Sequence, residues 1–233
     1  MCTAGLAGLA ALVAGCSTAH YRKAADQEVY QIIEQAEEDV FGRHSEFAID
    51  TPYSTRKATE VRAAEIVRQR QEPGTLQLNL DESLKLAVNN SREYQTEKER
   101  LYLTALTLTG ARYQFSPKFL AGGSGSVTRD SSGDISAAAN PKFSVSQLLQ
   151  SGASLGANLA TDFLRYYTGD PSRSAVSTFS VNIAQPLLRG AGKSIVAENL
   201  KQSERNVIYG IRTYSQYQRK FVVKIVNDYF GLL

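Results

Sequence analysis

The sequence predicts a mixed α and β fold in which long helices flank a block of antiparallel strands. Three observations predict it. Apolar residues recur at helical spacing over residues 19–41 and 76–117. Between residues 118 and 188 the pattern changes to an alternation with a period of two. The helical period then returns after Gly192 and continues to Leu233.

Composition excludes several functional classes. The chain has 233 residues and a formal net charge of +3, which is too small to favour nucleic-acid binding. Two cysteines and two histidines cannot build a disulfide framework or a His-rich metal site. No spaced cluster of Asp and Glu stands out either. We therefore expect no catalytic residues, no bound cofactor and no metal site, and the chain is not expected to be an enzyme.

The N-terminus carries a targeting signal. The sequence starts with an uncharged apolar run, MCTAGLAGLAALVAGCS (1–17). Residues 1–15 of this run are typical of a signal peptide and are too few to span a membrane. The sequence Val13-Ala14-Gly15-Cys16 resembles the bacterial lipobox, which implies that Cys16 is acylated and becomes the first mature residue. No Lys or Arg precedes the run, unlike in most signal peptides. The alternative is a buried N-terminal helix in which Cys16 has no special role. The residue after Cys16 is Ser17 and not an acidic residue, which by the same resemblance implies the outer membrane.

Residues 16–75 are predicted to be a helical spacer behind the lipid anchor. The first helix, over residues 19–41, places five apolar residues on one face: Val29, Ile32, Ile33, Ala36 and Val40. A loop with Pro52 follows. Ser54 or Thr55 is then expected to cap a charged helix that ends near Gln71.

Residues 76–117 are predicted to be helical, with Asp81 as the N-cap and a stop before Pro117. Leu84, Ala87 and Val88 form a first apolar stripe. A second stripe consists of Leu101, Ala105, Leu108 and Ala111.

Residues 118–188 are predicted to contain strands and loops. Two runs of about 11 residues alternate clearly, ASLGANLATDF (153–163) and STFSVNIAQPL (177–187), and each is long enough to cross a bilayer as a tilted strand. FLAGGSGSVTR (119–129) and PKFSVSQLL (141–149) alternate less clearly, so the pattern leaves two or four strands open. SSGDISAAANP and RYYTGDPSRSA are expected to be long loops, and QSGA a tight turn. The edge of a soluble β-sandwich would alternate in the same way.

Residues 189–233 are predicted to form one long helix of the coiled-coil type. Its apolar residues recur every three, four or seven positions from Val196 to Ile225. Arg205, Arg212 and Arg219 repeat every seven residues. They are expected to form a solvated ridge, with a partner-binding stripe as the alternative.

The stretch PLLRGAGKS (186–194) raises the alternative of a phosphate-binding loop at Gly190–Ser194. The Walker pattern G-x-x-x-x-G-K-[ST] requires a first glycine at the position of Leu187, and it follows a continuously hydrophobic strand, not an alternating one. A strand-to-helix corner explains the residues better. Pro186 would end the strand, while Gly190 and Gly192 would let the chain turn.

With these residues placed, residues 76–233 resemble the N-terminal half of a TolC-family outer-membrane efflux protein. The matching pieces are NLDESLKLAVNNSREYQ, ARYQFSPKF, QPLLRGAG and NDYFGLL, in that order. The resemblance implies a homotrimer whose strands share one outer-membrane β-barrel and whose helices form a periplasmic tube. It implies a passive conduit, of an efflux or type I secretion system, that works with a periplasmic adaptor protein and an inner-membrane pump.

The resemblance also assigns roles to strand residues. Thr178, Ser180, Asn182, Ser154 and Asn158 would face the lumen, while Phe179, Val181 and Ile183 would face lipid. The family has two strands in this half, and a second half with the closing helical hairpin is expected beyond Leu233. Residues 17–74 match nothing in the family. The remaining alternative is a porin-like barrel lipoprotein that works without a pump.

Overall fold

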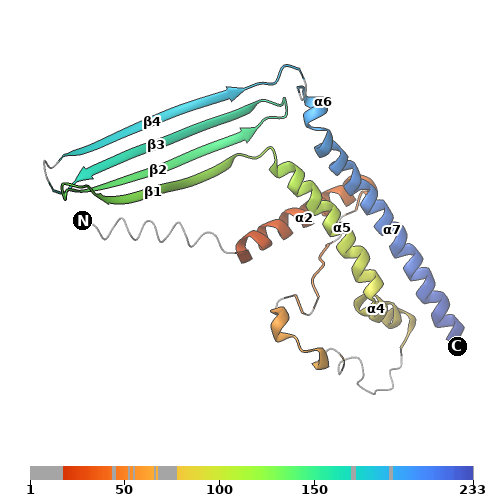
Figure 1. Ribbon diagram of the computed structural model, residues 1–233. Coiled ribbons are helices and arrows are strands. Elements are labelled where there is room, and N and C mark those ends of the chain that lie inside the picture. Colours follow the sequence, from red (N-terminus) through yellow and green to blue (C-terminus); the bar gives the residue numbers. More distant parts are fainter. Residues whose placement is uncertain are drawn as a thin grey trace. The chain divides into compact units, whose positions relative to one another are not determined.

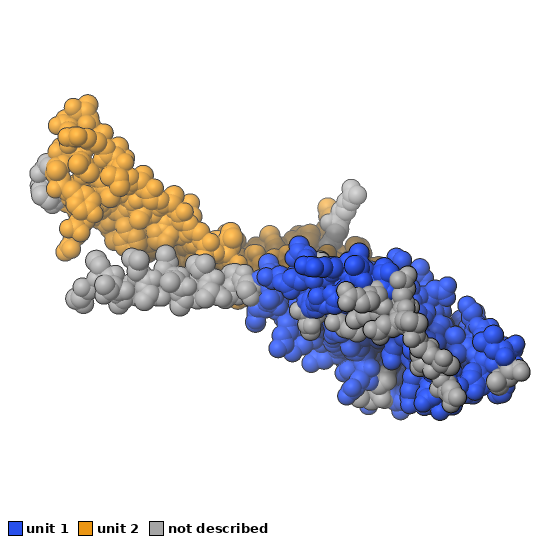
Figure 2. Space-filling model, turned by 90° about the horizontal axis from the view of Figure 1, so that it is seen from below, with its two compact units in different colours: residues 1–109, 203–233 blue, residues 110–202 orange. Residues whose placement is uncertain are grey.

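The computed structural model describes residues 18–43, 46–51, 53–54, 56–65, 67, 78–168, 172–188 and 191–232. The fold combines helices with one antiparallel sheet, as the periodicity predicts. The chain divides into two compact units, residues 1–109 with 203–233 and residues 110–202 (Figure 2).

The first unit is helical. It contains α2 (Thr18–Phe41), the short 3₁₀ helix η1 (Ala58–Glu60), α4 (Leu80–Asn90), and most of α5 (Arg92–Tyr113) and α7 (Glu198–Leu232) (Figure 1). Its buried apolar residues come from α2, the following loop, α5 and α7: Val29, Ile32, Ile33, Phe47, Leu101, Ala105, Leu108, Val207, Ile211, Tyr214 and Phe221. Each helix contributes residues three, four or seven positions apart, so the predicted apolar stripes of α2, α5 and α7 are confirmed.

Polar contacts tie the same helices together. The hydroxyl of Tyr102 donates a 2.5 Å hydrogen bond to Asp26 Oδ1, which joins α5 to α2. Gln218 Nε2 of α7 donates to the hydroxyl of Tyr94 on α5 at 3.1 Å. Gln95 Nε2 donates to the backbone oxygen of Ile49 at 2.7 Å, which holds the loop after α2 against α5. These three contacts pair polar groups that the packing partly buries, whereas the buried hydroxyls of Thr109 and Tyr217 have no hydrogen-bond partner among the residues that the structure describes.

The start of α4 corrects the sequence prediction. Its N-cap is Asn79, not Asp81: the Asn79 side chain accepts from the backbone N–H of Glu82, and the Glu82 carboxylate accepts from the backbone N–H of Asn79. This reciprocal capping box satisfies two backbone donors at once, which a cap at Asp81 would not do. Asp81 lies within the first turn and pairs with Lys85. The helix also ends at Ser91, so α4 and α5 are two helices and not one continuous pattern.

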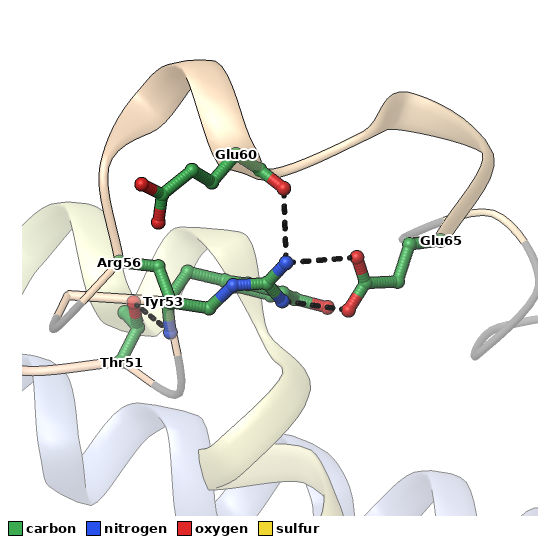
Figure 3. A network of polar contacts seen from close by, with 5 residues as sticks. All are labelled: Thr51, Tyr53, Arg56, Glu60 and Glu65. Atoms are coloured by element: carbon green, nitrogen blue, oxygen red, sulfur yellow. Dashed lines mark hydrogen bonds and ion pairs between the residues drawn. The ribbon is translucent and has the colours of Figure 1, made fainter.

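The charged helix expected from Ser54 or Thr55 does not form in that way. Ser54 lies in a turn, residues 58–60 form the 3₁₀ helix η1, and the described residues 63–65 and 67 are helical. The Arg56 guanidinium holds this segment, because it donates to both carboxylate oxygens of Glu65 at 2.7 and 3.2 Å and to the backbone oxygen of Glu60 at 2.9 Å (Figure 3). The arginine contacts therefore hold two short helical pieces together in place of one straight helix. Thr55 and most of residues 66–77 lie outside the described residues.

The second unit contains the sheet. Its four antiparallel strands follow chain order: β1 (Lys118–Arg129), β2 (Ile135–Leu148), β3 (Ser154–Tyr166) and β4 (Arg173–Ala184) (Figure 1). The choice between two and four strands is thus settled at four. With an even number of strands, β1 begins and β4 ends at the same end of the sheet, which we call the corner end. The opposite end, where β3 passes to β4, is the far end.

Residues 131–141 are expected to form a loop. The loop is shorter than predicted, because β2 already begins at Ile135. Its run of three alanines, Asn140 and Pro141 has weak strand propensity. Pairing with β1 on one side and β3 on the other nevertheless keeps it extended. Pro141 has no N–H to donate, and the ladder with β3 is interrupted at residues 140–141. The turn at QSGA is tight, as predicted, with Leu149 N–H donating to Ala153 O at 2.7 Å.

The helical segment after the sheet is divided, which corrects the single helix predicted from Lys193. A four-residue helix, α6 (Lys193–Val196), ends at Ala197, and α7 begins at Glu198. Ala197 is almost fully buried and still donates its N–H to Lys193 O. No Gly or Pro marks this break, so the local sequence gives no signal for it.

Candidate functional site

The two faces of the sheet differ in chemistry. Successive side chains of a strand point to opposite faces, and the registers pair odd with odd and even with even positions across all four strands. The odd-numbered side chains therefore share one face, which we call the apolar face. Its large apolar members are Phe119, Val127, Phe143, Val145, Leu155, Leu159, Phe163, Phe179, Val181 and Ile183.

The apolar face is not covered by other described parts of this unit. Phe119, Phe179 and Ile183 are 71%, 69% and 73% exposed. Such a large contiguous apolar surface is unusual for a protein in water and indicates contact with lipid or another protein. The two hydroxyls in its middle, Thr161 and Ser177, lie 3.0 Å apart and bond to each other. The face therefore keeps few unsatisfied polar groups.

The even-numbered side chains form the polar face. It carries mainly hydroxyl and amide groups: Ser124, Ser126, Thr128, Ser136, Asn140, Ser144, Ser146, Ser154, Asn158, Ser174, Thr178, Ser180 and Asn182. Three charges, Lys118, Lys142 and Asp162, lie on the same face. Asn140 Nδ2 donates to Asp162 Oδ1 at 2.6 Å. Apolar side chains on this face lie toward the ends of the strands: Leu120, Leu148, Leu164, Tyr166 and Val176. The polar groups between them can contact water.

The five strand residues singled out from the sequence lie on this polar face. Asn158 of β3 is directly opposite Ser180 of β4, and Gly156 separates Asn158 from Ser154 while pairing with Asn182. Thr178 pairs with Ala160. The register thus brings these residues into two adjacent rows. Sequence reasoning missed the contribution of β2, where Asn140, Lys142, Ser144 and Ser146 alternate in the same phase.

The edges of the sheet are also part of the site. β1 pairs with β2 alone and β4 with β3 alone among the described strands. Each outer edge therefore presents a row of backbone N–H and C=O groups that this unit does not satisfy. Open edges of this length are normally covered or paired in proteins.

The strand-to-helix corner is fastened to the turn between β2 and β3. Gly192 N–H donates to Ser151 O at 3.2 Å, and Gln185 Nε2 donates to the same oxygen at 3.4 Å and to Pro186 O at 2.9 Å. Gly192 has φ 94° and ψ 142°, a conformation that residues with a Cβ rarely adopt. Pro186 follows the end of β4 by two residues. Gly190, the third predicted corner residue, and Cys16, the predicted lipidation site, lie outside the described residues.

The geometry gives no support to a phosphate loop. Such a loop needs backbone N–H groups that point at the anion. Ala191 N–H donates to Leu188 O and Gly192 N–H to Ser151 O, so both are already engaged. The helix that follows, α6, has four residues, and Lys193 is exposed.

Within the described ranges, none of the helices has the length and apolar character that a membrane span requires. The same residues contain no group of three or more His, Cys, Asp and Glu side chains that could hold a metal ion.

Comparison with known proteins finds no family model and no curated protein that matches this chain.

Proposed function

We propose that the chain is a subunit of an outer-membrane channel, in which its four-stranded sheet forms a sector of a β-barrel shared with other copies. The single observation that carries the proposal is the division of the sheet into one apolar and one polar face, both exposed. In a membrane barrel the apolar face contacts lipid and the polar face lines a water-filled lumen.

The dimensions of the strands support this proposal. The four strands have 12, 14, 13 and 12 residues, and a tilted strand needs about 9–11 to cross a bilayer. Each strand is thus long enough to cross with residues to spare at the interfaces. A soluble sheet of the same kind would need a second layer of about equal area over the apolar face.

The open edges support closure by further copies. Unsatisfied backbone groups in the hydrocarbon layer cost several kcal/mol each. A sheet is therefore stable in that layer only when it closes into a barrel. Three copies of the four-stranded sheet would bring the strand number within the range of about 8 to 26 found in such barrels. We therefore propose a homotrimer, in agreement with the TolC-family resemblance.

The hydroxyl-rich polar face supports a role as a conduit that does not catalyse a reaction. Its groups can contact water and solutes but offer no nucleophile with an activating base. We propose passive transport through the lumen, with energy supplied by an inner-membrane pump that contacts the channel through a periplasmic adaptor. Acylation at Cys16 would anchor each copy to the outer membrane.

A matched pair of arginine substitutions tests the proposal. Phe179→Arg places a charge on the apolar face near its middle, and Ser180→Arg places the same charge on the polar face one residue away. In bilayers, Phe179→Arg should destabilise the assembled channel by about 2–4 kcal/mol. Ser180→Arg should leave assembly intact and shift single-channel conductance and ion selectivity. Equal effects of the two variants would contradict the proposal.

The pump is tested separately. On the proposed account, deletion of the chain abolishes export of pump substrates while inward diffusion of small solutes changes little. The opposite result would favour the porin-like alternative.

A further inference from the structure

Near the far end of the sheet, one row of the apolar face holds a pair of arginines, and Arg129 of β1 lies one row further out, where its Nε donates to Gly133 O. Arg165 of β3 lies directly opposite Arg173 of β4, and both side chains are on the apolar face and exposed. Like charges directly opposite each other in a sheet repel and are destabilising. Among the described residues, no ion pair includes either of them. The pair is therefore a concentrated positive charge without an acidic partner in the described part of the chain.

The two arginines border a groove of about 510 Å³. Ala137, Ala139 and Ala175 line it, and their small side chains leave room above the strands. Phe163 lines it on the side of the apolar face. The groove thus combines an apolar lining with a cationic border, which suits a ligand that carries both an anion and a hydrocarbon chain.

Tyr167 contacts Arg165 at the border of the groove. The Arg165 guanidinium carbon lies 5.0 Å from the centroid of the Tyr167 ring, within the range of a cation–π contact. Backbone pairing fixes the tyrosine itself, because its N–H donates to Ile135 O at 2.8 Å. The guanidinium is therefore oriented at the groove by a neighbour with a defined position.

In the proposed barrel, the arginine row would lie at the level of the lipid headgroups. The large apolar residues of β3 extend from Leu155 to Phe163, about 26 Å along the strand. At a tilt of roughly 40° this covers about 20 Å of bilayer thickness, close to the apolar band of membrane barrels. The arginine row is the next row of the same face. Because the corner end leads to helices that the proposed function places in the periplasm, the far end reaches the outer leaflet.

We propose that Arg165 and Arg173 bind the phosphate of a phosphorylated lipid of the outer leaflet, whose acyl chain lies along the groove toward Phe163. This inference rests on the proposed function. Guanidinium groups bind phosphate oxygens through two parallel hydrogen bonds, and two opposed arginines supply two such donors. The phosphate also removes the repulsion between the arginines. The ligand is a membrane lipid, since the apolar groove has no role in binding free phosphate.

The test compares two double variants of the full chain, Arg165→Gln with Arg173→Gln and Lys118→Gln with Lys142→Gln. The second is the matched control, because it removes two positive charges from the polar face of the same sheet. Each protein is reconstituted in phosphatidylcholine bilayers that contain a small fraction of lipid A with two phosphates. Lipid retained on the purified protein is measured by native mass spectrometry.

The wild type and the lysine variant should retain the phosphorylated lipid in preference to phosphatidylcholine. The arginine variant should bind it more weakly, by about tenfold for each arginine. Equal weakening in the lysine variant, or no preference in the wild type, would overturn the inference. So would displacement of the lipid by inorganic phosphate alone, which would show a simple anion site.

The design separates this inference from the proposed function. Insertion of every variant into the bilayers is measured first, by flotation of the vesicles. Failure of the wild type to insert would contradict the channel itself. Insertion of the wild type without retention of phosphorylated lipid would contradict the arginine site and leave the channel intact.

Discussion

Gly210 of α7 faces Leu101 of α5 so closely that a Cβ atom at Gly210 would lie 3.2 Å from Leu101 Cδ1. Thr104 of α5 lies on the same side, with its Cγ2 atom 3.7 Å from that Cβ position. Glycine in a helix normally weakens it, so its presence here is explained by the contact between the two helices. Helices α5 and α7 lie side by side (Figure 1) and supply most of the buried apolar residues of the helical unit.

The contact predicts different outcomes for two helical glycines. Gly210→Leu should lower the free energy of unfolding by about 1–3 kcal/mol, because the larger side chain overpacks against Leu101. Gly110→Ala in α5 should raise it by about 0.5–1 kcal/mol, since nothing lies within 4 Å of the added Cβ. Urea unfolding followed by circular dichroism measures both. A neutral Gly210→Leu would show that α5 and α7 are not packed in this way.

The cap of α4 gives a second pair of variants. Asn79→Ala removes the capping box and should cost about 1 kcal/mol of stability. Asp81→Ala removes an exposed ion pair with Lys85 and should cost less than about 0.5 kcal/mol. The same unfolding measurement decides between them. A larger cost for Asp81→Ala would restore the cap predicted from the sequence.

The corner gives a third pair. Gly192→Ala forces a Cβ into a left-handed conformation and should destabilise the second unit by about 1–3 kcal/mol. Lys193→Ala, at the neighbouring exposed position, should change neither stability nor assembly. Nucleotide binding to the wild type is measured by fluorescence of a labelled ATP analogue. Binding that Lys193→Ala abolishes would establish the phosphate loop and contradict the corner.

The buried tyrosine Tyr214 makes stability sensitive to alkaline pH. The pKa of its hydroxyl is raised above the ordinary value of 10.0, mainly because the side chain is buried. In the unfolded chain Tyr214 loses its proton near pH 10, whereas the folded protein retains it. Folding therefore binds a proton above that pH, and stability falls as the pH rises.

Replacement of Tyr214 by Phe should make this decline shallower. The free energy of unfolding is measured between about pH 8 and pH 11, with Tyr113→Phe as the control, since its side chain is exposed. An unchanged decline in Tyr214→Phe would show that Tyr214 is not the source of it.

Regular periodicity made much of the fold predictable. The stripes at Leu101, Ala105 and Leu108 and at Val207, Ile211 and Tyr214 recur at helical spacing and are buried as expected. The alternation around Leu159 and Phe179 located β3 and β4, although both strands extend into the expected loop RYYTGDPSRSA and β4 ends at Ala184. Both signals are local repeats that persist over several turns or residue pairs, so a single exception does not obscure them.

The remainder depends on contacts that are distant in sequence or on choices between near-equivalent residues. Asn79 and Asp81 are both good caps two positions apart, and only the reciprocal bond with Glu82 selects Asn79. The start of β2 at Ile135 follows from pairing on both sides. The arginine pair at the far end required the register, because Arg165 and Arg173 are opposite each other only after β3 and β4 are aligned.

The most direct test of the central claim is a cysteine scan of β4 from Thr178 to Ile183 in lipid bilayers. The sequence has two cysteines, Cys2 and Cys16. On the proposed function Cys2 is removed with the signal peptide and Cys16 is acylated, so a single cysteine placed in the strand is the one that reacts with the label. A fluorescent label is attached at each position and exposed to quenchers carried by lipid or dissolved in water.

A sheet with its apolar face in lipid and its polar face in water should give strict alternation. Labels at Phe179, Val181 and Ile183 should be quenched by lipid-borne bromine, and labels at Thr178, Ser180 and Asn182 by aqueous iodide. Quenching by iodide at all six positions, or lipid quenching at none, would contradict a sheet whose apolar face lies in the membrane.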